Sequence, residues 1–164
     1  MFLEMNDILY EYQFGFRKNY STSQAVMEVL DNIYQSCDNC ETMGIYLDLQ
    51  KAFDTVNHSI LLKKLEIYGV REIIQKWFKS YLSNRKQYIV LSNHESELES
   101  ITCGVAQGSV LGPLLFLIYI NDIQYTISSS HTKVKLFADD TNLFLHNRDP
   151  AQLFGHLYCL VSLF

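Results

Sequence analysis

Two short apolar segments, residues 134–137 and 142–145, are separated by only four residues, and this pattern constrains the fold most strongly. The separating residues, 138–141 (ADDT), are of the kinds that favour tight turns. The pattern predicts an antiparallel β-hairpin with Asp139 and Asp140 at its tip. Another short apolar segment, residues 45–49, has strand character and contains one carboxylate, Asp48.

Helical periodicity marks most of the remaining apolar residues. Residues 21–24 (STSQ) form a predicted capping box, and apolar residues follow at helical spacing as far as Cys37. Gly69 is predicted to end a later helix, and Pro113 suits the first turn of another. The predicted helices cover about residues 21–37, 60–68, 73–82, 113–120 and 153–164, and two further strands cover about residues 87–91 and 98–102.

Length and composition indicate one globular unit. The chain has 164 residues, 48% of them hydrophobic, and no linker or repeat interrupts it. The longest apolar run, residues 114–120, is too short to cross a membrane, and the acidic start is unlike a signal peptide. We therefore expect an intracellular protein of the cytoplasm, the nucleus or both. Its four cysteines are expected to be reduced thiols rather than disulfides or a zinc site, although Cys37 and Cys40 have a suggestive spacing.

The charge balance alone disfavours a nucleic-acid partner. The chain has 13 Lys and Arg against 18 Asp and Glu, a formal net charge of -5, whereas nucleic-acid-binding faces are usually basic. Residues 61–90 differ, because they contain seven bases and two acids. This stretch is either a solvated helix face or a basic surface that binds nucleic acid.

Three carboxylates have the arrangement of a metal site. Asp48 lies within an apolar segment, and Asp139 and Asp140 are adjacent in a turn. Like charges in such positions are costly, and a divalent cation is the usual remedy. Oxygen ligands suit Mg²⁺, which completes its shell with water and substrate phosphates, so the set indicates phosphoryl transfer. Taken without its context, the Asp139-Asp140 pair is more simply explained as a turn.

Four sequence blocks resemble the reverse transcriptases of LINE-type (non-LTR, jockey-like) retrotransposons, in that family's order. Residues 45–58 (IYLDLQKAFDTVNH) are similar to motif A, residues 104–116 (GVAQGSVLGPLLF) to motif B, and residues 137–140 (FADD) to the motif C hairpin. Residues 13–17 (QFGFR), with Ser21 and Thr22, resemble the block that precedes motif A. The resemblance covers about residues 10–148. A group II intron maturase fits less well around residues 53–56.

The resemblance implies an α/β right-hand polymerase palm, an antiparallel sheet backed by helices, with partial fingers and no thumb. The implied reaction is RNA-directed DNA synthesis from dNTPs on an RNA template and a DNA primer, with two Mg²⁺ ions for which Mn²⁺ can substitute. In that reading Asp48, Asp139 and Asp140 are the catalytic metal ligands. Phe53 is a steric gate against the 2′-hydroxyl, or plain core packing. Gln107 and Gly108 contact the nascent pair and the template backbone, although Gly108 also suits the turn that begins a helix.

The resemblance also leaves alternatives open. Ala106 stands where the family commonly has proline. We expect the family's basic triphosphate contacts, motif D lysine, primer grip and thumb to have no counterpart within these 164 residues. We therefore expect a partial reverse transcriptase domain over residues 1–150, a divergent helical end over 151–164, and little polymerase activity from the isolated chain. The alternative function is a non-catalytic remnant or a domesticated interaction module. The sequence does not indicate an oligomeric state.

Overall fold

The computed structural model describes residues 2–37, 41–92, 94–127 and 132–161. The single globular unit that composition indicates is not observed, because the chain divides into two compact units. The first combines Met1–Gln50 with Ile120–Phe164, and the second is Lys51–Tyr119. The chain thus leaves the first unit after its first strand and returns to complete the sheet. The predicted division into residues 1–150 and 151–164 stays a prediction. Within the described residues, no helix has both the length and the apolar character needed to cross a membrane.

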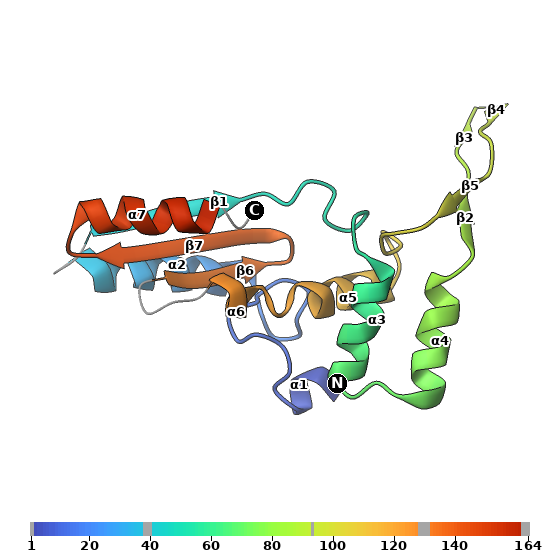
Figure 1. The fold of residues 1–164 in the computed structure, drawn as a ribbon, viewed down its shortest axis with the longest axis horizontal. Coiled ribbons are helices and arrows are strands. Elements are labelled where there is room, and N and C mark those ends of the chain that lie inside the picture. The colour runs from blue at the N-terminus through green and yellow to red at the C-terminus, as the bar shows by residue number, and fades with distance from the viewer. Residues whose placement is uncertain (1, 38–40, 93, 128–131, 162–164) are drawn as a thin grey trace. The chain divides into compact units, whose positions relative to one another are not determined.

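The first unit is built on a three-stranded sheet in the order β1-β7-β6, which Figure 1 shows. Strand β7 (Asp140–Asn147) pairs antiparallel with both β1 (Glu41–Leu47) and β6 (Thr132–Phe137). The predicted hairpin and the predicted antiparallel sheet are therefore confirmed. Strand β1 begins four residues earlier than expected and ends before Asp48, because it follows the length of β7 rather than the apolar run alone.

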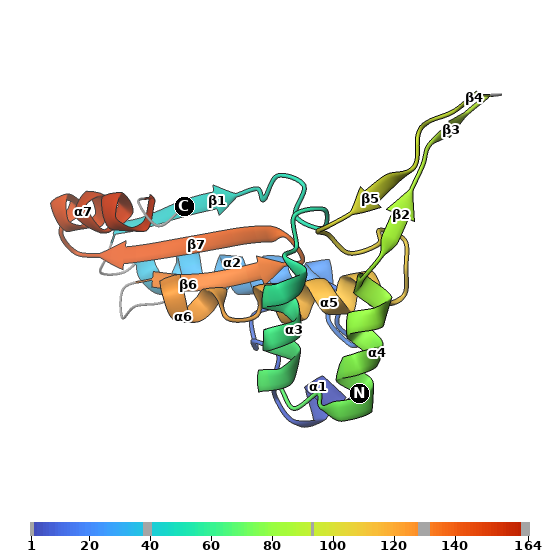
Figure 2. The ribbon, with the colours of Figure 1, turned by 45° about the vertical axis from the view of Figure 1, so that its right-hand side comes forward.

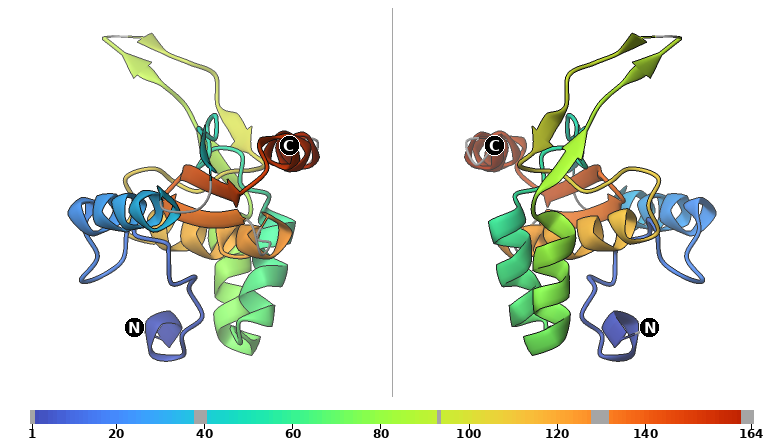
Figure 3. Two further views of the ribbon diagram at one scale, coloured as in Figure 1. Left: turned by 90° about the vertical axis from the view of Figure 1, so that its left-hand side faces the viewer. Right: turned by 90° about the vertical axis from the view of Figure 1, so that its right-hand side faces the viewer.

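One face of this sheet carries the core of the first unit. Buried side chains of β6 and β7 pack there against Ile127 of α6 (Ile123–Ile127) and Leu153 of α7 (Pro150–Val161); those strand residues are Val134, Leu136, Leu143 and Leu145. The other face is approached by α2 (Thr22–Cys37), which Figure 3 shows across the sheet from α7. A short helix, α1 (Phe2–Met5), begins the described chain.

The capping box that the sequence predicts at the start of α2 is present. The Ser21 backbone N–H donates to Gln24 Oε1 over 2.8 Å, and the Gln24 N–H donates to Ser21 Oγ over 3.2 Å. These reciprocal bonds satisfy two donors that a helix start otherwise leaves unpaired. They fix the position at which α2 begins beside the sheet.

The second unit consists of helices and a long β-ribbon. Helices α3 (His58–Ile67) and α4 (Glu72–Leu82) lie side by side, as Figure 2 shows. Helix α5 (Leu111–Ile120) is the last element of the unit along the chain. Gly69 has φ +91°, which suits the predicted end of α3. The ribbon pairs β2 (Arg85–Gln87) with β5 (Glu99–Ile101), and β3 (Val90–Leu91) with β4 (His94–Glu95).

The ribbon differs from the two strands predicted over residues 87–91 and 98–102. The first is divided into β2, which begins at Arg85, and β3, and the second is shortened to Glu99–Ile101. Between the two predicted strands, His94 and Glu95 form strand β4. Both residues are polar and exposed, so the apolar-polar alternation by which a strand is recognised in a sequence is absent there. Cys103 is a free, exposed thiol, while Cys40 and the side chains of Cys37 and Cys159 lie outside the described part of the chain.

Candidate functional site

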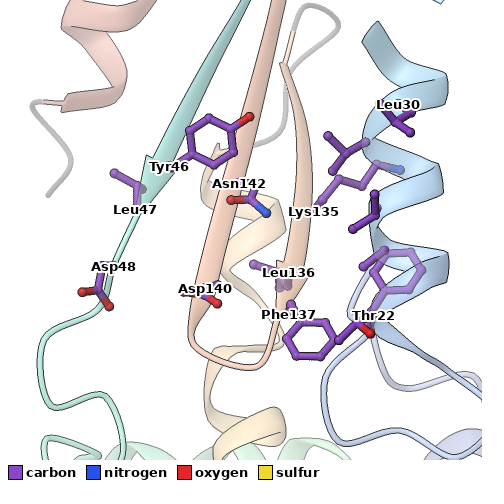
Figure 4. Close-up of a pocket in the computed structure, with 14 residues that line it drawn as sticks. Thr22, Leu30, Tyr46, Leu47, Asp48, Lys135, Leu136, Phe137, Asp140 and Asn142 are labelled. Atoms are coloured by element: carbon purple, nitrogen blue, oxygen red, sulfur yellow. The ribbon is translucent and has the colours of Figure 1, made fainter. Parts of the chain in front are cut away.

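Asp48 and Asp140 lie at the same end of two neighbouring strands. The last residue pair between β1 and β7 joins Leu47 to Thr141, so one further step of the antiparallel register sets Asp48 opposite Asp140. Figure 4 shows the two carboxylates there, and both residues are exposed. The long-range pairing of β1 with β7 therefore brings together two of the predicted site residues.

The alternation of side chains along the strands places these carboxylates on the face that α2 approaches. Tyr46 of β1 and Asp48 directly after it, with Asp140 and Asn142 of β7, line one cavity of about 510 Å³. Apolar residues of α2, including Val26 and Leu30, line the same cavity. The exposed carboxylates of Asp48 and Asp140 thus line a cavity whose wall on the α2 side is apolar.

Asp139 lies at the tip of the β6–β7 hairpin. Phe137 and Asp140 form the closing pair, so the connection consists of Ala138 and Asp139 alone. Both aspartates were predicted at the tip; the structure places Asp139 there and makes Asp140 the first residue of β7. Ala138 has φ +56° and Asp139 does not have a positive φ, which is the pattern of a type II′ hairpin turn. The shorter turn explains why Asp140 joins the strand.

The donor chemistry of these residues fits a hard divalent cation, since carboxylate oxygens are the ligands that Mg²⁺ prefers. Among the described residues, however, no three His, Cys, Asp or Glu side chains are grouped closely enough to hold a metal ion. The structure brings Asp48 and Asp140 together, and the complete set of three metal ligands stays a prediction.

A buried lysine that is paired with a glutamate lines this cavity. Lys135 of β6 is only 4% exposed, and its Nζ lies 2.8 Å from Glu28 Oε2 and 3.0 Å from the centre of the Tyr12 ring. Burial lowers the pKa of Lys135 below its usual value, and the hydrogen bond that Lys135 donates to Glu28 opposes part of that shift. The sequence analysis missed this residue, although a lysine within the apolar 134–137 segment was a signal that could have identified it.

Phe53, predicted as a steric gate or as core packing, lies in the second unit. Its ring stacks on Phe116 of α5, with centroids 4.5 Å apart and planes 27° from parallel. The backbone carbonyl of Phe53 accepts a hydrogen bond from the Val105 N–H over 2.8 Å. Packing is therefore observed, and the gate role is compatible with it because Phe53 is only half-buried.

Gln107 is held by a residue that the sequence analysis did not single out. Its Nε2 donates to Asp54 Oδ1 over 2.9 Å, and both residues are exposed. Nearby, the Gly104 N–H donates to the Val56 carbonyl, and the Gly104 carbonyl lies 2.6 Å from His58 Nε2. The 104–107 loop is thus bound to residues 53–58 along their length.

A cavity of about 500 Å³ adjoins this loop within the second unit. Asp54, His58 and Gln107 line it together with Tyr81 and Arg85. The cavity that Gln107 lines thus has a carboxylate and a guanidinium among its polar groups.

Gly108 has a conformation that favours glycine. Its φ is +76°, and a Cβ added there would meet no other atom within 4 Å. The positive φ supports the turn before α5, while the open space above the residue leaves room for a ligand to approach the backbone. Both readings of Gly108 are therefore compatible with the structure.

The six predicted site residues fall into two groups. Asp48, Asp139 and Asp140 belong to the first unit, and Phe53, Gln107 and Gly108 belong to the second. The basic stretch 61–90 also lies in the second unit, where six of its seven basic residues are exposed; these are Lys63, Arg71, Lys76, Lys79, Arg85 and Lys86. Lys64 instead donates to the Tyr119 carbonyl.

Comparison with known protein families gives one match across almost the whole chain. The model described as "Reverse transcriptase (RNA-dependent DNA polymerase)" matches residues 2–163. The chain is 37% identical over 123 residues to the probable RNA-directed DNA polymerase from transposon BS of Drosophila melanogaster, covering 71% of this chain and 13% of that relative. It is 33% identical over 152 residues to the corresponding X-element protein of the same species, covering 89% and 16%.

One further curated relative and one solved structure are also similar to the chain, the first in sequence and the second in fold. The RNA-directed DNA polymerase from mobile element jockey of Drosophila melanogaster is 31% identical over 137 residues, 80% of this chain and 15% of the relative. Among solved structures, telomerase from Candida albicans in complex with a fragment of telomeric RNA has a TM-score of 0.67 at 14% identity, covering 98% of this chain and 31% of that one. The chain thus spans about a seventh of the length of its curated relatives.

Proposed function

Since the chain belongs to the reverse transcriptase family, we propose that it serves RNA-directed DNA synthesis, the transfer of a nucleotide from a dNTP to a primer 3′-hydroxyl. The predicted kinship with LINE-type, jockey-like retrotransposon enzymes is confirmed by the relatives. The predicted palm-like fold is confirmed by the antiparallel sheet and the likeness to telomerase. The substrates and partners are our proposal: an RNA template, a DNA primer and dNTPs.

The observation that carries this proposal is the placement of Asp48 and Asp140 side by side at one end of the sheet, next to the turn that holds Asp139. Enzymes of this family use divalent metal ions, and we propose two Mg²⁺ ions, replaceable by Mn²⁺. When bound, such ions lower the pKa of the attacking hydroxyl and stabilise the charge on the leaving pyrophosphate. Asp48 and Asp139 bind the ions, and Asp140 supports them through its negative charge.

The second unit supplies the substrate contacts in this proposal. Phe53 presents its half-buried ring to the sugar of the incoming nucleotide and disfavours a 2′-hydroxyl by steric exclusion. Gln107, held by Asp54, contacts the nascent base pair, and Gly108 allows the template backbone to approach. The exposed bases of residues 61–90 attract the phosphates of the polynucleotide.

A non-catalytic interaction module is the alternative function. Such a module requires no particular placement of Asp48, Asp139 and Asp140. Their position at one end of the sheet therefore gives this alternative no support. The two functions differ in what they predict for conservative changes at Asp48 and Asp139. A module that only binds a protein partner tolerates Asp→Asn at both positions.

Primer extension and Mn²⁺ binding test the proposal together. With an oligo(dT) primer on poly(rA), we expect little extension by the isolated chain. Asp48→Asn and Asp139→Asn are expected to abolish what extension there is, and to weaken Mn²⁺ binding measured by electron paramagnetic resonance. Asp149→Asn, a change in the exposed loop before α7, is the matched control and leaves both unchanged. The proposal is wrong if neither substitution at the site affects Mn²⁺ binding, or if wild-type extension that rises above background is retained in Asp139→Asn.

A further inference from the structure

Residues 12–14 run alongside the strand that leads into the aspartate turn. The Phe14 N–H donates to the Leu136 carbonyl over 2.8 Å, and the Leu136 N–H donates to the Tyr12 carbonyl over 2.9 Å. Gln13 thereby forms an isolated parallel bridge with Leu136. The block that precedes motif A is thus attached to the free edge of β6, immediately before the turn.

The side chain of Gln13 reaches the turn itself and uses both ends of its amide. Gln13 Oε1 accepts from the Ala138 N–H over 2.9 Å and from the Gly15 N–H over 2.8 Å, and Nε2 donates to the Ala138 carbonyl over 3.3 Å. Gln13 is only 2% exposed. A buried amide that binds the N–H and the carbonyl of one turn residue fixes the orientation of both adjoining peptide groups.

Gly15 shows how closely the two segments approach. A Cβ added to Gly15 would lie 2.2 Å from the Ala138 backbone nitrogen and 2.7 Å from its Cα. These contacts involve backbone atoms, which cannot rotate away as a flexible side chain can. Only glycine therefore fits there without displacing the turn.

The turn needs such support because of the residue at its first central position. A type II′ turn has positive φ there and favours glycine, but this chain has Ala138 with φ +56°. The left-handed conformation costs a residue with a Cβ roughly 1–2 kcal/mol. Hydrogen bonds from outside the turn offset this cost, and Gln13 provides them at the residue directly before Asp139.

We propose that Gln13 is a positioning residue for the metal site, because it fixes the turn that carries Asp139 and begins the strand that carries Asp140. This inference rests on the proposed function, since it assigns to Gln13 the alignment of the carboxylates that bind the ions. Alignment matters in phosphoryl transfer, where a displacement of about 1 Å can cost on the order of 10²-fold in rate. We call the hydrogen bonds between the Gln13 side chain and Ala138 the clamp of Gln13 on Ala138. Gly15 allows the close approach of the two segments that this clamp requires.

The test separates positioning from general stabilisation. Gln13→Met keeps the length of the side chain and removes its hydrogen bonds, and we expect the Mn²⁺ dissociation constant to rise about 10–100-fold, the usual effect of losing a group that orients metal ligands. Hydrogen exchange of the Ala138 amide is expected to accelerate in the same variant. Asn121→Leu is the matched control, because the buried Asn121 amide likewise binds backbone groups, at Ile8 and Tyr10. It lowers stability but leaves the Mn²⁺ constant and the Ala138 exchange unchanged.

A second variant covers the case in which Gln13→Met does not fold. Gln13→Glu keeps an oxygen that accepts from Ala138 and Gly15, and when protonated the introduced carboxyl also donates to the Ala138 carbonyl, as the amide does. Protection of the Ala138 amide, corrected for intrinsic exchange, is therefore expected to rise as pH falls in this variant and not in the wild type.

The outcomes distinguish the two proposals. An unchanged Mn²⁺ constant in Gln13→Met, or Ala138 exchange in Gln13→Glu that has the same pH dependence as in the wild type, overturns the role of Gln13. If Asp139→Asn still weakens Mn²⁺ binding in that case, the proposed metal site remains supported and only the role of Gln13 is wrong. If Asp139→Asn binds Mn²⁺ as the wild type does, the proposed function and the role of Gln13 are both wrong.

Discussion

Gln107 Nε2 donates a hydrogen bond to Asp54 Oδ1 over 2.9 Å, which ties the loop before α5 to the segment before α3. Both residues are exposed, so the bond is expected to contribute at most about 1 kcal/mol to the free energy of unfolding. Its larger effect is on the orientation of the Gln107 amide, which is free to rotate once its partner is removed.

Asp54→Ala is therefore expected to lower stability by less than about 1 kcal/mol and to raise the dissociation constant for dNTP several-fold in the presence of Mn²⁺. Urea unfolding and isothermal titration calorimetry measure the two effects. Asp149→Ala, which removes an exposed acceptor of a backbone hydrogen bond at the start of α7, is the control. An unchanged dissociation constant for dNTP in Asp54→Ala would contradict the role assigned to Gln107.

Two glycines of the same loop are expected to respond differently to alanine. Gly104 has φ +86°, and a Cβ there would lie 2.8 Å from the Asp54 carbonyl oxygen, so strain and a backbone clash add together. Gly108 has φ +76° but open space, so strain acts alone at roughly 1–2 kcal/mol. We expect Gly104→Ala to reduce the free energy of unfolding clearly more than Gly108→Ala does, measured in urea. Equal losses would show that the 104–107 loop moves away from Asp54 without cost.

Gly155→Ala serves as the reference for those two variants. Gly155 lies within α7, is exposed, and would place an added Cβ in open space. Alanine at such a position is expected to stabilise the chain by roughly 0.5–1 kcal/mol. A loss of stability in this variant would contradict the helical assignment of α7.

Local patterns of the sequence predicted the elements whose signals are local. The start of α2 was predicted from Ser21 and Gln24, whose side chains make the reciprocal capping bonds. The end of α3 was predicted from Gly69, which has the positive φ that this position requires. Such signals depend on residues within one turn of each other, so they can be recognised without the rest of the fold.

Features that depend on distant residues were not predictable in the same way. The end of β1 before Asp48 is set by its pairing with β7, and the burial of Lys135 is made possible by Glu28 from α2. The clamp of Gln13 on Ala138 joins positions 125 residues apart. The family resemblance identified the aspartates, but the residues that hold them in place emerge only from contacts between segments.

The ion pair of Lys135 and Glu28 gives an asymmetric prediction. Glu28 is 40% exposed by its side chain and Lys135 only 4%. Glu28→Gln leaves a buried ammonium with a weaker partner, and we expect a loss of about 1–3 kcal/mol in the free energy of unfolding. Lys135→Met replaces the charge by an apolar chain of similar length and is expected to be nearly neutral or stabilising. Urea unfolding of the two variants and of their combination measures this difference.

The double variant provides the control for that comparison. Glu28→Gln is expected to have almost no effect once Lys135 is Met, because no buried charge remains to be neutralised. If Glu28→Gln were equally costly in both backgrounds, its effect would arise from α2 itself rather than from the pair.

The exposed bases of the second unit are expected to give salt-dependent binding to single-stranded RNA. Each phosphate neutralised contributes about 0.7 to the slope of log K against log salt. Neutralising Arg85 and Lys86 together is therefore expected to reduce the slope by up to about 1.4. Fluorescence anisotropy at several salt concentrations measures it, with Arg148→Gln, just beyond β7, as the control. An affinity insensitive to salt, or a slope that survives both changes, would support the simpler reading of a solvated helix face.

Tyr10 links stability to pH in the alkaline range. Its hydroxyl donates to the Val134 carbonyl over 2.9 Å, and its ring packs against the core of the first unit. Burial, assisted by the nearby charge of Glu11, raises the pKa of Tyr10 from 10.0 to about 12. Between these values the folded chain keeps a proton that the unfolded chain has lost, so the contribution of Tyr10 to stability is fully present below pH 10 and falls as pH rises toward about 12.

Tyr10→Phe removes both the hydrogen bond and this titration. We expect the variant to be less stable than the wild type by about 0.5–1.5 kcal/mol at pH 9, and the difference to shrink as pH is raised above 10 because only the wild type loses a contribution there. Urea unfolding at pH 9, 10 and 11 measures the difference directly, and the remaining tyrosines titrate in both proteins and cancel. A difference that stays constant over this range would show that the Tyr10 proton has the same affinity in the folded and unfolded chains, and that burial beside β6 does not affect it.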